Sequence, residues 1–247
     1  MYKPTAVLLL CSLAAAAAPK RVLYFTHSAG FVHGSLPASC EVMKDLGART
    51  GEFDVLCSED LSLISADTLR EFDILYFFTS GELDLNDRQK ADMLNFVHEG
   101  KGFGGAHSAT DTFYNWPEYG EMIGAYFNGH PWTQEVVVRV EELDSPLARG
   151  LEANFRIADE IYQFRDFSRD RVHVLLSLDT SSVDLAAPGI ARDDGDFPLA
   201  WYRDYGAGRV FYTALGHPDE TWRDERFQIL LLNALRWLGG DMAPAER

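Results

Sequence analysis

The sequence is poor in basic residues and in cysteines. Lys and Arg number 22 against 38 Asp and Glu, which gives a formal net charge of −16 over 247 residues, and only three cysteines occur. A negative field of this size repels nucleic-acid phosphates and anionic lipid headgroups, so we expect neither as a partner. A neutral ligand such as a sugar, or a cation, is compatible with it. No two cysteines form a CxxC pair, which argues against a cysteine-based metal site.

The sequence also lacks an apolar run long enough to cross a membrane. Its one marked apolar run, Ala6–Leu13, follows Lys3 and precedes the small residues of Ala14–Ala18. A spanning helix needs about 20 apolar residues, whereas this layout is typical of a secretory signal peptide. We therefore predict a signal peptide over residues 1–18 with cleavage within Ala14–Ala17. The mature protein would be exported to the periplasm or the extracellular space and would not be bound to a membrane.

No linker, internal repeat or low-complexity segment follows the predicted signal. Aromatic residues are abundant, with 16 Phe, 10 Tyr and 5 Trp, so the chain can bury a large core. We predict a single domain over residues 19–247. Cys40 and Cys57 fall on a predicted helix and at a predicted strand end. An oxidising compartment would permit them to pair, but the sequence leaves that pairing open.

The first half of the chain alternates between strands and helices. Ser35 and Asn86 are predicted N-caps, and Pro37 falls in the first turn of its helix. Such alternation is typical of a parallel, doubly wound sheet. Strands are predicted at Arg21–Thr26, Phe53–Cys57, Phe72–Thr79 and Gly102–Ala106, with helices from Ser35 to about Leu46 and over Asn86–Glu99.

The second half has a different pattern. Short alternating segments replace the strand–helix repeat, and Gly206-Ala-Gly between two apolar runs indicates a β-hairpin. We therefore expect antiparallel additions at one edge of the parallel sheet. The predicted strands are Glu135–Glu141, Ile161–Phe164, Val172–Leu178, Leu199–Tyr205 and Arg209–Ala214, and a last helix covers Arg226–Leu238.

Most histidines fall where a ligand is expected. In open parallel sheets, ligands bind beyond the carboxyl ends of the strands. Two histidines, His98 and His173, are predicted to be ordinary surface residues. The other five lie at strand ends or in the following loops: His27, His33, His107, His130 and His217.

His107 is the leading candidate for chemistry. It stands in Gly104–Asp111 (GGAHSATD), where small residues allow a sharp turn that exposes the side chain at its apex. An imidazole there can serve as acid, base or metal ligand. Asp111 could orient His107 or cap the next helix, and Ser108 could be a nucleophile, although it lacks the flanking glycines of a nucleophile elbow.

Several other residues could complete a site. Trp116 and Trp132 each lie beside a proline in a loop-like stretch, so we predict that they form platforms for a sugar ring. Glu160 is predicted to precede a strand and could pair with a histidine or a metal. His217 is followed closely by Glu220, a spacing that suits a base and the carboxylate that orients it.

Four ordered segments resemble the ThuA-like (trehalose-utilisation) family, and the resemblance covers about Arg21 to Leu238. It implies a class I glutamine amidotransferase-like fold, which is a flavodoxin-like three-layer α/β/α sandwich with a mostly parallel central sheet. True amidotransferases have a cysteine at the elbow, where this chain has His107, so thiolate-based glutamine hydrolysis is disfavoured. The segments are Gly30-Phe-Val-His-Gly-Ser, Gly104–Trp116 with Ile123-Gly-Ala-Tyr-Phe-Asn-Gly-His-Pro, Asp159-Glu-Ile-Tyr, and Pro198-Leu-Ala-Trp with the following Gly206-Ala-Gly-Arg-Val-Phe-Tyr-Thr-Ala-Leu-Gly-His.

The resemblance also implies a role in carbohydrate catabolism. The leading hypothesis is an enzyme that isomerises, eliminates or hydrolyses a (keto-)disaccharide or glycoside, with His107 as base and His217 or Glu160 as acid partner. A divalent metal could polarise the carbonyl group, and its candidate ligands are His33, His107, His130 and His217. The candidate substrate-binding residues are His33, Ser108, Asp111, Trp116, His130 and Trp132.

Two alternatives remain open at this point. The protein could be an exported sugar-binding module without catalysis, in which the histidines serve only as hydrogen-bonding groups. It could also be a serine hydrolase that uses Ser108. A homo-oligomer is compatible with the sequence.

Overall fold

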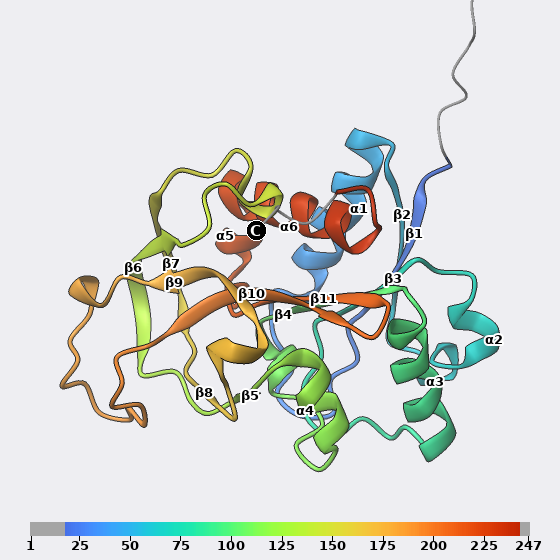
Figure 1. The fold of residues 1–247 in the computed structure, drawn as a ribbon, viewed down its shortest axis with the longest axis horizontal. Coiled ribbons are helices and arrows are strands. Elements are labelled where there is room, and N and C mark those ends of the chain that lie inside the picture. The colour runs from blue at the N-terminus through green and yellow to red at the C-terminus, as the bar shows by residue number, and fades with distance from the viewer. Residues whose placement is uncertain (1–17, 243–247) are drawn as a thin grey trace, which may run out of the picture.

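The structure, a computed structural model, describes residues 18–242. Apart from Ala18, the predicted signal peptide over residues 1–18, with its expected cleavage region, lies outside the described residues. Within them, one nine-stranded sheet forms the middle layer. Helices α1, α5 and α6 cover one face of the sheet, and α3 and α4 cover the other (Figure 1). This is the predicted flavodoxin-like, three-layer α/β/α architecture.

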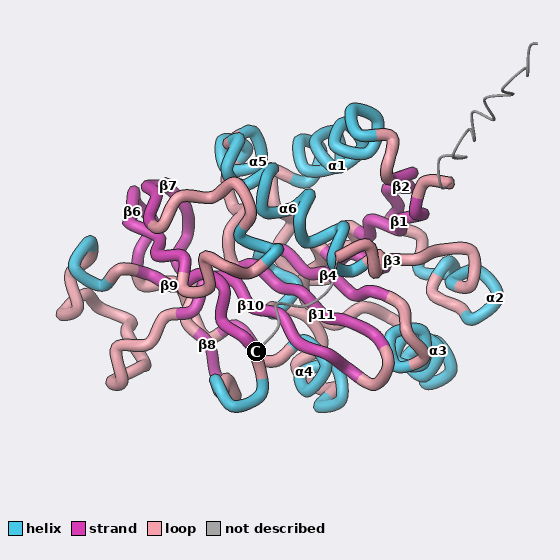
Figure 2. The backbone as a smooth tube through the Cα atoms, turned by 45° about the horizontal axis from the view of Figure 1, so that its top comes forward, coloured by secondary structure: helices cyan, strands magenta, loops and turns pink. Residues whose placement is uncertain are grey.

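The strands follow the order β2-β1-β3-β4-β11-β10-β9-β6-β7, and Figure 2 shows them as one twisted band. A two-stranded ribbon of β5 and β8 lies beside it. The strands are β1 (Lys20–Phe25), β2 (Phe53–Ser58), β3 (Ile74–Phe77), β4 (Gly102–Ala106), β5 (Tyr126–Phe127), β6 (Trp132–Val140), β7 (Asn154–Ile161), β8 (Phe164–Arg165), β9 (His173–Leu178), β10 (Pro198–Tyr205) and β11 (Gly208–Thr213).

The helices connect the strands of the first half and close the chain. They are α1 (Leu36–Thr50), α2 (Ala66–Leu69), α3 (Asp87–His98), α4 (Pro117–Ile123), α5 (Asp219–Arg223) and α6 (Glu225–Leu238). A short 3-10 turn, η2 (His107–Thr110), follows β4 directly. None of the helices among residues 18–242 has the length and apolar character that crossing a membrane requires.

The sheet has two differently built halves. In the parallel half, β2, β1, β3 and β4 all run the same way, and β11 pairs with β4 in that direction too. In the antiparallel half, β10, β9, β6 and β7 alternate in direction, and β10 forms the predicted hairpin with β11. Strand β11 therefore joins the halves. The apolar runs that predicted the parallel half lie at 0% exposure in β3, as expected for a strand covered on both faces.

One predicted strand was wrong. The segment Ile161–Phe164 is not a strand of the sheet: β7 ends at Ile161, and only Phe164 begins the short β8. In β7 the buried positions alternate, but one of them is occupied by Asp159 instead of an apolar residue. That buried carboxylate interrupts the hydrophobic alternation by which a strand is recognised.

One of the two predicted helix N-caps is confirmed, and the two cysteines pair. Asn86 caps α3 as predicted, in a reciprocal capping box with Gln89. Ser35 makes no side-chain cap on α1; its hydroxyl instead donates to the carbonyl oxygen of Gly216, in the loop after β11. Cys40 and Cys57 form a disulfide between α1 and β2.

Candidate functional site

The turn after β4 holds His107 in a strained conformation. Its φ of 46° lies in the left-handed region, where a residue with a side chain costs of order 1–3 kcal/mol. The preceding strand β4 is rich in glycine. At Gly104 no larger residue fits, because a Cβ there would come within 2.1 Å of the Tyr76 ring. These features match the predicted sharp elbow. The expected exposure was wrong, however, since His107 is 0% exposed.

Backbone and side-chain contacts fix the orientation of His107. Its Nδ1 lies 2.8 Å from the carbonyl oxygen of Ala214, so Nδ1–H donates there and Nε2 carries the lone pair. The Tyr162 hydroxyl donates to that Nε2 across 2.8 Å. The backbone carbonyl of His107 accepts a hydrogen bond from Tyr212 at 2.7 Å. The ring is therefore held in one tautomer with Nε2 toward the centre of the site.

Asp159 on β7 holds the loop that follows β11. Its buried carboxylate accepts hydrogen bonds from the backbone N–H groups of Gly216 at 2.8 Å and His217 at 3.0 Å, and from the Thr221 hydroxyl at 2.9 Å. The N–H of Glu160 adds a fourth, at 2.8 Å. Asp159 thus sets the position of His217, while Glu160 projects from the same strand.

Glu160 lies among three histidines. Its Oε2 is 3.2 Å from His217 Nδ1 and 3.6 Å from His107 Nε2, and its Oε1 is 3.8 Å from His130 Nδ1. His217 Nδ1 is itself 3.3 Å from His107 Nε2. The structure therefore brings together the three residues that we predicted to be catalytic. The carboxylate beside His217 is Glu160, from a distant strand, whereas Glu220 is exposed.

His33 reaches the same cluster from the loop after β1. It is 5% exposed, and its ring lies 4.8 Å from that of His107 and 5.4 Å from that of His217. Its Nδ1 lies 3.5 Å from the hydroxyl of Ser108, which is buried. Ser108 therefore faces His33 and does not line the pocket described next.

A pocket of about 220 Å³ opens above this cluster. That volume is below the roughly 300–1,000 Å³ of most ligand pockets, so it suits one sugar ring more than a whole disaccharide. No Lys or Arg occurs among its lining residues. They are Phe31, His33, Asp111, Phe127, His130, Glu160, Tyr162 and His217.

The histidines and Glu160 influence one another electrostatically. Burial, followed by the charges of His107 and His217, lowers the pKa of His33 to about 3. Burial also lowers the pKa of His217, although Glu160 opposes that shift. Burial works against ionisation of Glu160, but the neighbouring imidazoles of His107, His217 and His130 lower its pKa overall. Near neutral pH, Glu160 is therefore a carboxylate beside neutral His33 and His217.

The two neighbouring aspartates shift the other way. Burial raises the pKa of Asp111, opposed by its hydrogen bond from the Tyr114 hydroxyl at 2.5 Å. The Asp111 carboxylate accepts this hydrogen bond and lines the pocket. It does not cap the next helix, α4, whose N-cap position is Trp116. Burial also raises the pKa of Asp159, against the charge of His107 and the hydrogen bonds that Asp159 accepts.

The two predicted tryptophan platforms are elsewhere. Trp116 is 7% exposed and packs edge-on against Phe113. Trp132 is 3% exposed, and its indole N–H donates to the carbonyl oxygen of Asp184. Neither lines the pocket, because each ring is used in the core. The aromatic rings that do line it are Phe31, Phe127 and Tyr162.

The remaining histidines lie outside the pocket. The ring of His27 contacts the backbone carbonyl of Glu59. His98 is exposed at the end of α3, and His173 stacks on Tyr202. Sequence reasoning missed Asp159 and Tyr162 as site residues. Both belong to the segment Asp159-Glu-Ile-Tyr that carried the family resemblance, so the signal was present there.

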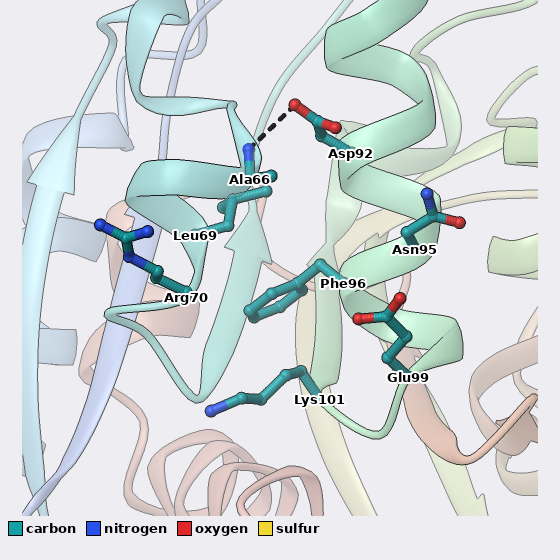
Figure 3. Close-up of a pocket in the computed structure, with 8 residues that line it drawn as sticks. All are labelled: Ala66, Leu69, Arg70, Asp92, Asn95, Phe96, Glu99 and Lys101. Carbon is teal, nitrogen blue, oxygen red and sulfur yellow. Dashed lines mark hydrogen bonds between the residues drawn. The ribbon is translucent and has the colours of Figure 1, made fainter.

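A second pocket, of about 310 Å³, lies between α2 and α3 (Figure 3). Its polar groups include Arg70, Asp92 and Lys101, and the Asp92 carboxylate accepts a hydrogen bond from the N–H of Ala66. Lys101 directly precedes β4, so this pocket lies near the amino ends of the parallel strands. It contains no histidine, and it lies opposite to the end where such folds bind ligands.

The fold and site define a class: a flavodoxin-like α/β protein with a histidine at the elbow after β4. More specifically, the chain belongs to the ThuA family, described as trehalose utilisation, whose model matches residues 21–238. That membership supports a carbohydrate-related role. No curated protein matches the sequence.

Solved structures agree with this assignment. A putative ThuA-like protein from Bacteroides uniformis ATCC 8492 is 25% identical with a TM-score of 0.73, covering 91% of this chain and 93% of that one. One from Parabacteroides merdae ATCC 43184 is 21% identical with a TM-score of 0.72, covering 93% and 92%. A β-galactosidase from Bacillus circulans sp. alkalophilus shares the fold alone, at 11% identity and a TM-score of 0.57, covering 92% of this chain and 32% of that one.

Proposed function

We propose that the protein is an exported enzyme of carbohydrate catabolism that acts on a (keto-)disaccharide or glycoside in the histidine-lined pocket. The observation that carries this proposal is the convergence of Glu160, His217 and His107. Their nearest nitrogen and oxygen atoms lie within 3.6 Å of one another at the pocket floor. Family membership supports the sugar, and these groups support chemistry upon it.

A keto-sugar is the substrate class that best matches this cluster. Removing the proton beside a ketone leaves its electron pair on the carbonyl oxygen as an enolate. Where the deprotonated carbon carries a hydroxyl, protonation of the former carbonyl carbon with loss of the hydroxyl proton gives isomerisation. Expulsion of a leaving group from the carbon beyond the deprotonated one re-forms the ketone and gives elimination. Glu160 and His217 line the pocket and reach the ligand. His107 is fully buried and does not line the pocket. In this proposal it contacts Glu160 and His217, and it is not the base that contacts the sugar.

The rim of the pocket supports sugar binding. Phe31 is 63% exposed, and Phe127 and Tyr162 lie across the same pocket with ring centroids 4.3 Å apart. Aromatic faces can lie against the C–H face of a sugar ring. Because the pocket holds one ring, the second sugar or the aglycone would extend past Phe31 to the outside.

Two other classes of activity find less support. The two cysteines among residues 18–242 are joined in a disulfide, so they offer no thiolate for amidotransferase chemistry. Ser108 is 1% exposed and 3.5 Å from His33 Nδ1, a poor arrangement for a serine nucleophile. The disulfide supports the proposed export, since disulfides persist in oxidising compartments.

Turnover measurements on matched variants test the proposal. Purified protein is incubated with 3-keto disaccharides and their unoxidised parents, and products are followed by chromatography. We expect wild-type turnover of a keto-sugar, and a loss of about 10²–10⁴-fold in Glu160→Gln with sugar binding retained. Glu220→Gln, an exposed neighbour of His217, is the control and should retain full activity.

Three outcomes would contradict the proposal. Sugar binding by the wild type without any turnover would favour the binding module. Loss of activity on Ser108→Ala, with Glu160→Gln fully active, would favour the serine hydrolase. Full activity in both Glu160→Gln and Ser108→Ala would show that the Glu160–His217–His107 cluster takes no part in the reaction.

A further inference from the structure

Three ligand atoms at the pocket floor form a triangle of the size that a metal ion requires. His217 Nδ1 lies 3.3 Å from His107 Nε2 and 3.2 Å from Glu160 Oε2, and the latter two atoms are 3.6 Å apart. Bonds of about 2.0–2.1 Å in a tetrahedral zinc site place ligand atoms about 3.3–3.4 Å apart. The three edges therefore match one face of such a tetrahedron.

A fourth donor lies beside the triangle. Ring nitrogens of His33, His107 and His217 all lie within 4.8 Å of one another. His130 lies outside that group: its Nδ1 is 3.8 Å from the other Glu160 oxygen, Oε1, and its side chain is 44% exposed. The sequence-based ligand set is thereby changed, with Glu160 in place of His130.

His107 is prepared as a ligand before any ion arrives. Its Nδ1–H donates to the carbonyl oxygen of Ala214, so the Nε2 lone pair points into the cluster. There it accepts the hydrogen bond from the Tyr162 hydroxyl, which a bound ion would displace. Metal-binding histidines characteristically use the second ring nitrogen in this way, because the hydrogen bond fixes both the tautomer and the ring. The strained turn at φ 46° holds the ring there.

The charges of the site favour a cation. Glu160 and Asp111 line the pocket, and Asp159 lies buried behind it, while no Lys or Arg occurs among the lining residues. Several electron-pair donors thus surround one point with no fixed cation beside them. One divalent ion would satisfy the crowded lone pairs of His107, His217 and Glu160 together.

We propose that His107, His217 and Glu160, with His33 as fourth donor, bind one divalent transition-metal ion. Imidazole nitrogens with a single carboxylate suit zinc and its first-row neighbours better than magnesium or calcium, which prefer oxygen. The role of the ion rests on the proposed function: bound there, it would supply Lewis-acid chemistry that draws electron density from the sugar carbonyl and makes the neighbouring C–H more acidic. As ligands of the ion, His217 and Glu160 would hold it at the pocket floor, and the half-exposed His130 would remain available for proton transfer.

Metal titration without any sugar tests the site. Chelator-treated protein is titrated with Co²⁺, followed by visible absorption and calorimetry, and then with Zn²⁺. We expect one equivalent of Co²⁺ with the intense bands of a four-coordinate ion, displaced by Zn²⁺. Glu160→Gln and His217→Gln should each weaken binding by about 100-fold or more, since even outer-shell changes cost about 10–100-fold.

His130→Gln is the matched control, because it changes a histidine of the same pocket outside the donor set. We expect it to bind Co²⁺ within about twofold of wild type. Circular dichroism and a melting curve verify that each variant is folded, which matters most for the buried His107. Failure of wild type to bind Co²⁺ or Zn²⁺ would overturn the proposal, as would unchanged binding in Glu160→Gln or an equal loss in His130→Gln.

The titration separates this proposal from the proposed function. One bound ion without turnover of any sugar would support the metal site and overturn the enzyme. Turnover of a keto-sugar by chelator-treated protein would leave the enzyme standing and remove the ion from its reaction.

Discussion

The parallel and antiparallel halves of the sheet contribute to the site in different ways. The parallel half supplies His33 and His107, which are 5% and 0% exposed. The antiparallel half supplies Glu160 and His130, whose side chains are 14% and 44% exposed. The first half therefore builds a fixed floor, whereas the second brings the groups that a ligand can reach. A parallel strand covered on both faces leaves its end residues buried, and an edge strand leaves them accessible.

Asp159 joins the two halves. It lies on β7 at the outer edge of the antiparallel half, yet it holds the backbone of Gly216 and His217 after β11. Strand β11 pairs with β4, so the carboxylate fixes one half against the other. Substitutions should therefore separate into those that disturb the Asp159 junction, those that affect one half of the sheet, and those at the pocket rim.

Breaking the junction should have the largest effect. In Asp159→Asn, an amide nitrogen would face backbone N–H donors and leave buried groups unpaired, at about 1–3 kcal/mol for each. We expect the free energy of unfolding to fall by about 3 kcal/mol, with a loss of turnover in protein that is still folded. Urea denaturation and turnover measure the two effects. Asp170→Asn, exposed in the antiparallel half, is the control; equal denaturation midpoints for the two variants would refute the bridge.

Opening the disulfide, which lies in the parallel half, should lower the stability of the protein and spare its activity. Cys40 and Cys57 are 17 residues apart, and a loop of that size gives about 3 kcal/mol of stabilisation. The double Cys→Ser variant should melt roughly 6–12 °C lower by calorimetry. Turnover at 25 °C should persist, because neither cysteine lines the pocket. Loss of turnover well below the melting temperature would show that the outer edge of this half also supports the site.

Truncating the rim should change binding and spare the chemistry. Phe31→Ala removes an exposed ring that lines the pocket, so we expect KM to rise about 5–10-fold with kcat within about twofold. Val32→Ala is the matched control, since Val32 is 67% exposed and does not line the pocket. Steady-state kinetics distinguish the two. A fall in kcat at constant KM would assign Phe31 to the chemical step.

Lowering the pH should slightly reduce the free energy of unfolding through the Glu141–Arg169 ion pair of the antiparallel half. Hydrogen bonds from the Arg169 guanidinium lower the pKa of Glu141, although burial opposes the shift. A folded pKa below the unfolded value of about 4.3 gives stability above that pH, and this stability is lost as the pH falls through the folded pKa. Glu141→Gln should therefore flatten the acid limb of the stability curve by about 1 kcal/mol or less, given the exposure of the pair. Glu135→Gln, in a more exposed pair with Arg156, should leave the curve unchanged.

The sequence predicted the two halves unequally. In the parallel half, the apolar segments Arg21–Thr26 and Phe72–Thr79 predicted β1 and β3 within two residues at each end, because burial on both faces makes whole strands apolar. In the antiparallel half, β7 was missed because Asp159 occupies an inward position. Two tryptophans were misplaced for the opposite reason: loop-like surroundings suggested exposure, but Trp116 and Trp132 fill the core.

By itself, the sequence determined the fold class, the elbow at His107 and the gathering of histidines at strand ends, since these depend on local patterns and on one topological rule. Only the tertiary structure decided the partners. Glu160, and not the adjacent Glu220, lies beside His217, and His107 is buried where exposure was expected. The physical reason is that contacts across the sheet depend on which strands pair and in what register. The local pattern of residues does not contain that information.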